Sequence, residues 1–100
     1  MNFSPSNLKK IETLIKEGGY TLRYEKGNFN SGYCVLRDKN VVIVNKYFTD
    51  DVKFQKLLDI VSSIDFVQLT ALSESSIKLL EKIKPESLIV NPIPFENESK

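Results

Sequence analysis

The sequence feature that most constrains the fold is a run in which every residue is apolar, Val41-Val42-Ile43-Val44. A strand that is apolar at every position is typical of a place in a sheet that is covered on both faces. We therefore predict that residues 41–45 form the central strand of a sheet. Residues 33–37 form the other arm of a hairpin, because the short polar segment Asp38-Lys39-Asn40 joins the two.

The segment before the hairpin predicts a helix followed by one more strand. Ser4 is a good N-cap, and Pro5 suits the first helical position. Gly18-Gly19 ends the helix, because glycine readily adopts the left-handed conformation of a C-terminal cap. The apolar side chains in between recur at helical spacing and form the buried stripe: Leu8, Ile11, Leu14 and Ile15. Residues 20–25 alternate between apolar and polar, which indicates a half-buried strand with Tyr20, Leu22 and Tyr24 toward the core.

A second helix is predicted over residues 50–64. Thr49 is its cap, and Asp50 and Asp51 occupy its first turn, where the helix dipole favours negative charge. Its buried stripe consists of the apolar residues at helical spacing: Phe54, Leu57, Leu58, Val61 and Ile64.

Ser73 caps a third predicted helix, which ends before Pro85 and turns three apolar side chains inward: Ile77, Leu80 and Ile83. Residues 65–72 fit either a strand or a continued helix. The chain thus predicts one α+β domain over residues 1–100. It consists of an N-terminal helix, a three-stranded mostly antiparallel sheet, two C-terminal helices and an extended tail over residues 85–100, whose end we expect to be flexible.

Composition points away from several classes of protein. The 14 basic and 13 acidic residues nearly balance, although residues 1–46 carry about +4 and residues 47–100 about −3; such an imbalance can steer one molecule onto another. No apolar run exceeds four residues, which is far too short to cross a membrane. The first residues lack the pattern of a signal peptide, and a lone cysteine, Cys34, fits a reducing compartment. We therefore expect a cytoplasmic protein that does not bind a membrane.

The residue types exclude the commonest catalytic arrangements. The chain has no histidine, which removes Ser-His-Asp and Cys-His sites and ordinary zinc sites. It also lacks the glycine-rich motifs that bind phosphate groups, so we expect no cofactor. Cys34 is the only soft nucleophile, and we expect it to point inward with Leu36. Glu25 is a candidate general base, but a cross-strand ion pair with Arg23 or Arg37 is the favoured interpretation.

Several motifs in the middle of the chain carry a family resemblance: Gly32-Tyr33-Cys34, Val41-Val42-Ile43-Val44-Asn45, Phe48, Asp50-Asp51 and Phe54. The segment is similar to the one that leads into the metal-binding helix of ImmA/IrrE-type zinc peptidases. That helix bears His-Glu-x-x-His, whereas this chain has Leu58, Asp59 and Ser62 at the matching positions. The resemblance implies a scaffold without the metal or the hydrolysis.

A second pattern extends over more of the chain: Arg23-Tyr24-Glu25, Gly32-Tyr33-Cys34 and Val44-Asn45. It resembles a family of small uncharacterised bacterial proteins. This resemblance implies a bacterial source but no function.

One face of the predicted sheet is the candidate binding surface. If Leu22, Cys34 and Leu36 point to the core, alternation places the following residues on the opposite face: Arg23, Glu25, Tyr33, Val35 and Arg37. An apolar centre with a charged edge is how recognition surfaces are usually built. The favoured function is therefore a non-catalytic protein-binding or assembly module, whose partner is another protein or a second copy in a homodimer.

Two alternatives stay open. The first is a binder of RNA or single-stranded nucleic acid, in which aromatic residues of a basic hairpin stack on bases: Tyr20, Tyr24, Phe29 and Tyr33, interleaved with Arg23, Lys26, Arg37, Lys39 and Lys46. The second is a degenerate metallopeptidase-like scaffold or a small enzyme that uses Glu25 or Cys34. The missing catalytic groups make an enzyme the less favoured interpretation.

Overall fold

The computed structural model describes residues 2–26, 32–64, 66 and 69–84. Within these ranges the elements follow in this order: α1 (Pro5–Glu17), β1 (Thr21–Glu25), β2 (Tyr33–Leu36), β3 (Val41–Asn45), α2 (Asp50–Ser63), a 3₁₀ turn (Leu69–Ala71) and α3 (Glu74–Ile83). The predicted α+β fold is confirmed. The predicted tail, the residues around Phe29 and part of 65–72 lie outside the described residues.

The sheet has the strand order β1-β3-β2, so β3 is its centre, as predicted. β2 and β3 form the predicted antiparallel hairpin, whereas β1 runs parallel to β3. The sheet is therefore mixed rather than mostly antiparallel. Seven residues separate β1 from β2. This length is sufficient for β2 to lie two strand positions away from β1, with β3 between them.

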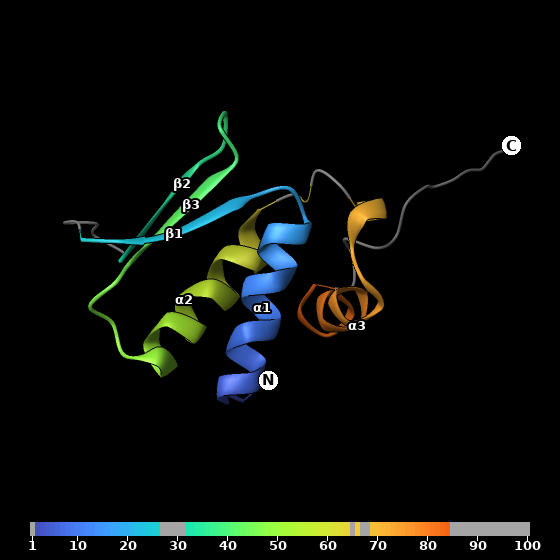
Figure 1. Cartoon of the computed structure of the whole chain (residues 1–100), viewed down its shortest axis with the longest axis horizontal. Coiled ribbons are helices and arrows are strands. Elements are labelled where there is room, and N and C mark those ends of the chain that lie inside the picture. The colour runs from blue at the N-terminus through green and yellow to red at the C-terminus, as the bar shows by residue number, and fades with distance from the viewer. Residues whose placement is uncertain (1, 27–31, 65, 67–68, 85–100) are drawn as a thin grey trace, which may run out of the picture.

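The helices α1 and α2 lie on one face of this sheet (Figure 1). Val42 and Val44 of β3 point toward them and are fully buried. Val41 and Ile43 point the other way and are only half-buried. The prediction that this strand is covered on both faces is therefore wrong, because among the described elements the helices cover only one face.

α1 begins and ends at the predicted signals. The Ser4 Oγ accepts a hydrogen bond from the Asn7 N–H at 3.0 Å, and Gly18 is the C-cap. Gly19 has a φ of 100°, a left-handed conformation that favours glycine. Gly18 is needed for a different reason, since a Cβ there would lie 2.1 Å from the Phe66 ring. The predicted apolar stripe is buried.

α2 differs from its prediction at the cap and in its stripe. The Thr49 hydroxyl makes no cap bond to the backbone and instead donates to the Asp51 carboxylate at 2.5 Å. Ile60, which the pattern did not include, is fully buried, whereas Leu58 is only partly buried against the core. The core of this helix therefore comprises Phe54, Leu57, Ile60, Val61 and, after its end, Ile64.

α3 packs on α1, on the side away from the sheet (Figure 1). Its cap is Ser73 as predicted, but the inward stripe is shifted. Ile77 is 36% exposed, while Leu79 and Leu80 are buried. The prediction for Ile77 is wrong because contact with α1 uses the side of α3 that carries Ser76, Leu79 and Leu80.

The start of α3 is tied to the end of α1 by Glu17. Its Oε1 accepts hydrogen bonds from the Ser73 N–H and Oγ, both at 2.9 Å. Bonds from the side chain of Ser76 and from Ser73 hold the pKa of Glu17 below its usual value. Among the described residues, no helix is both long enough and apolar enough to traverse a membrane.

We predict that Glu17→Gln weakens folding only when the carboxyl is ionised. A depressed pKa in the folded state gives stability that is present above the unfolded value of 4.5 and is lost as the pH falls through the folded pKa. At neutral pH the loss should be no more than about 0.5 kcal/mol, because water screens this exposed carboxylate, and urea unfolding measures it. It should shrink toward zero in acid. Glu81→Gln on the exposed side of α3 is the control and should change little; a pH-independent loss at Glu17 would contradict the account.

Candidate functional site

Strand register defines the face of the sheet that points away from the helices. Residues paired in register share a face, so Leu22 and Tyr24 of β1 lie on the helix side with Val42 and Val44. The opposite side chains form a surface that we call the outer face: Thr21, Arg23, Glu25, Cys34, Leu36, Val41, Ile43 and Asn45.

The two faces of β2 are the reverse of those predicted. Tyr33 pairs with Val44 and Val35 pairs with Val42, so Tyr33 and Val35 face the helices and pack against the core. Cys34 and the 36% exposed Leu36 lie on the outer face instead. All four residues of this strand are apolar, so its alternation does not distinguish the two faces. The register of the hairpin therefore decides which side chains of β2 face the helices.

Arg37 is also absent from the outer face. Its Nη2 lies 3.5 Å from the carbonyl oxygen of Ser63, the last residue of α2. A cation there complements the negative end of the helix dipole. Of the five residues predicted to form one binding surface, the structure therefore brings together Arg23 and Glu25 alone on the outer face.

Arg23 and Glu25 form an ion pair within β1. The Arg23 Nε lies 2.5 Å from the Glu25 Oε2, with the two side chains 59% and 40% exposed. The predicted ion pair thus exists, although it runs along one strand rather than across two. The Glu25 Oε2 atom is buried and has no partner with hydrogen-bond geometry.

Glu25 and Cys34 do not form a joint catalytic pair. They lie on the two edge strands with β3 between them, which separates their backbones by roughly 10 Å. A nucleophile and its base must instead lie within about 3 Å of each other. Both residues belong to a surface with an apolar centre and a charged edge.

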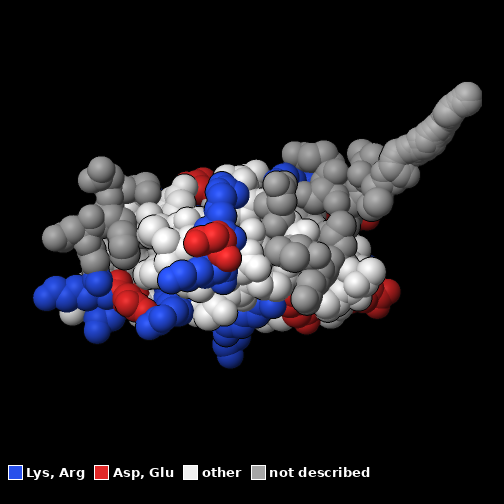
Figure 2. Space-filling model, turned by 90° about the horizontal axis from the view of Figure 1, so that it is seen from above, with Lys and Arg blue, Asp and Glu red and all other residues white. Residues whose placement is uncertain are grey.

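The centre of the outer face is apolar and has no described helix over it. Leu36 is exposed, and Cys34, Val41 and Ile43 are half-buried. Seen from above the hairpin, basic and acidic side chains stand beside one another amid uncharged surface (Figure 2). This side of the molecule therefore does not present a field of a single sign.

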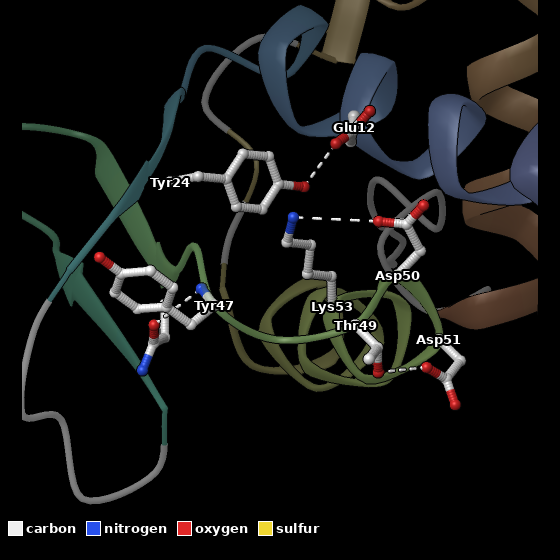
Figure 3. A network of polar contacts seen from close by, with 8 residues as sticks. Glu12, Tyr24, Tyr47, Thr49, Asp50, Asp51 and Lys53 are labelled. Carbon is white, nitrogen blue, oxygen red and sulfur yellow. Dashed lines mark hydrogen bonds and ion pairs between the residues drawn. The ribbon is translucent and has the colours of Figure 1, made fainter.

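A polar junction lies on the opposite side of the sheet, where α1, β1 and α2 meet (Figure 3). The Tyr24 hydroxyl donates a hydrogen bond to the Glu12 carboxylate. The Lys53 Nζ lies 4.8 Å from the centroid of the Tyr24 ring and 3.9 Å from the Asp50 carboxylate. Burial, and then the Glu12 carboxylate, raise the pKa of Tyr24, so its phenol is neutral and acts as a donor.

The junction fixes the sheet on the helices. It joins three elements through side chains that are distant in the sequence, and the Lys53 side chain is only 19% exposed. Sequence reasoning predicted that Tyr24 faces the core but did not predict its partners. The only local signal for the junction is the spacing of Asp50 and Lys53, which lie three residues apart on one helix.

The positions that match the peptidase motif lie on α2. Leu58 is partly buried, Asp59 and Ser62 are exposed, and the Ser62 Oγ donates to the Leu58 carbonyl at 2.9 Å. Within the described ranges, no three Cys, Asp or Glu side chains are grouped as a metal site requires. No protein-family model, curated protein or solved structure matches this chain. The resemblance stays a prediction.

We predict that Tyr24→Phe destabilises the fold by about 1–2 kcal/mol, because the Glu12 carboxylate loses a charge-assisted hydrogen bond in a half-buried position. Tyr47→Phe is the matched control, since Tyr47 is 68% exposed, and it should cost less than about 0.5 kcal/mol. Urea unfolding of both variants measures the difference. Equal values would show that the junction does not hold the layers together.

Proposed function

We propose that this chain is a non-catalytic protein-binding or assembly module that docks through the outer face. The observation that carries the proposal is that all described helices gather away from this face, while its centre is apolar. Leu36, Val41 and Ile43 supply the centre, and the Arg23–Glu25 ion pair supplies a polar edge. This combination of apolar core and polar rim is characteristic of protein interfaces.

A second copy of the chain is the partner that fits this face best. A two-fold interface brings the same patch of each copy together, so the patch must complement itself. The outer face meets that requirement because it carries one cation and one anion side by side. Rotation about a two-fold axis can place Arg23 of one copy against Glu25 of the other, while the apolar centres meet.

The size of the face predicts weak association. Strands of four or five residues are about 13–17 Å long, and three strands side by side span about 10–15 Å. Such a footprint is well below the ~800 Å² per partner of a standard stable interface. We therefore expect a reversible dimer that forms at tens of micromolar or above rather than a permanent one.

Two neighbouring substitutions on β2 test the proposal. Leu36→Asp places a charge on the outer face, so it should abolish the dimer in sedimentation experiments while the monomer stays folded. Val35→Asp places the same charge against the core, so it should destabilise the fold by about 2 kcal/mol or more. A wild-type chain that stays monomeric at hundreds of micromolar would refute the second copy as partner. Equal stability of the two variants would refute the face assignment.

The single cysteine provides a further readout of the same interface. Cys34 lies on the outer face, so its reaction with a maleimide should slow as the protein concentration rises and the dimer forms. The control chain combines Cys34→Ser with Ser62→Cys, which moves the thiol to an exposed position on α2. Its reaction rate should not depend on protein concentration.

The nucleic-acid alternative has less support. Tyr20 is buried, Tyr24 is bonded to Glu12 and Tyr33 packs against the core, so these rings do not form a stacking surface. Phe29 lies outside the described residues. The favourable observation is a different aromatic residue, Tyr47, which is exposed with the Lys46 Nζ 5.3 Å from its ring centroid.

We predict that single-stranded RNA binds more weakly than about 10 μM at physiological salt, because the exposed Tyr47 ring gains only ~1–3 kcal/mol from stacking on a base. Fluorescence anisotropy with a labelled oligonucleotide measures the affinity. A tighter complex that weakens steeply with salt, and that Tyr47→Ala disrupts while Leu36→Asp does not, would make nucleic-acid binding the better proposal.

A further inference from the structure

A second surface lies on the side of α1 that points away from the sheet, where this helix packs on α3. Two adjoining hollows run between these helices and share Lys10 and Ser75 in their walls, so they form one groove. Four lysines line the groove, two from each helix: Lys9, Lys10, Lys78 and Lys82. The other lining residues are hydroxyl-bearing side chains, one asparagine and one leucine, and none is acidic.

The sequence of α3 separates its charges by face. Ser75, Lys78 and Lys82 recur at spacings of three and four, which places them on the groove side of the helix. Glu74 and Glu81 fall on a different stripe, together with the exposed Ile77. Among the described residues, none of the four lysines takes part in an ion pair. No described carboxylate therefore neutralises their positive charge.

The two ends of the groove differ. At one end, the Glu17 carboxylate occupies the start of α3 by accepting hydrogen bonds from Ser73. The other end is lined by Lys10, Lys78 and Lys82. The second end, which has three lysines in its lining, therefore attracts an anionic ligand more strongly than the first.

We propose that this groove binds an acidic peptide segment of a partner protein, with carboxylates at alternate positions. Lys78 and Lys82 are one helical turn apart, with about 6 Å between their Cβ atoms. Alternate side chains on one side of an extended peptide are about 7 Å apart, so two acidic residues separated by one position can each pair with one of these two lysines. The exposed hydroxyls of Ser6, Thr13 and Ser75 line the same groove and can donate hydrogen bonds to the backbone of the peptide. This surface is separate from the outer face.

A fluorescent peptide of alternating glutamate and serine tests the proposal at low ionic strength. The double substitution Lys10→Glu/Lys78→Glu should weaken binding roughly tenfold or more, because two attractive contacts become repulsive. The matched control Lys39→Glu/Lys46→Glu makes the same change in net charge at the hairpin turn and after β3, and should change the affinity less than about twofold. Circular dichroism should show that both variants remain folded, since all four side chains are exposed.

Three results would overturn the proposal. Wild-type protein could fail to bind the peptide at millimolar concentration, or the two double variants could lose affinity equally, which would indicate a general charge effect. A peptide of the same composition with its glutamates in one block could bind as tightly as the alternating one, which would refute the spacing. Leu36→Asp should leave peptide binding unchanged, so the test is independent of the proposed dimer.

Discussion

The burial of Val42 and Val44 between the sheet and the helices is the contact on which the rest of the structure depends. Both side chains are fully buried on the central strand, with Phe54 and Leu57 of α2 in the same core. Because each strand of the sheet is in register with β3, this choice of face sets the orientation of every side chain in β1 and β2. The outer face consists of the side chains of the sheet that point away from this core.

The parts of the fold that sequence predicts well are those with local signals. Ser4 and Ser73 each accept a hydrogen bond from a backbone N–H of the first turn, and each is recognisable from residues within one helical turn. The apolar composition of β3 also predicts its central position, although only one of its two faces is fully buried. These features do not depend on what the rest of the chain does.

The parts that sequence does not predict depend on distant partners. In β2 both alternating sets are apolar, so only the register with β3 distinguishes Val35, which faces the core, from Leu36, which does not. For the same reason the alternation predicts the face of Arg23 and Glu25 correctly in β1, where it is clear, and the faces of the side chains wrongly in β2. The bond from Tyr24 to Glu12 joins two elements and has no local signature.

The parallel pairing of β1 with β3 has a consequence for how the chain folds. The hairpin joins residues only five positions apart, as in the pair of Leu36 with Val41, whereas Thr21 pairs with the same Val41 across twenty. Closing the longer loop costs about 1.2 kcal/mol more in chain entropy. In addition, β1 has no strand to pair with until β3 has formed in the hairpin. We therefore expect the local hairpin contacts to form before β1 pairs with β3.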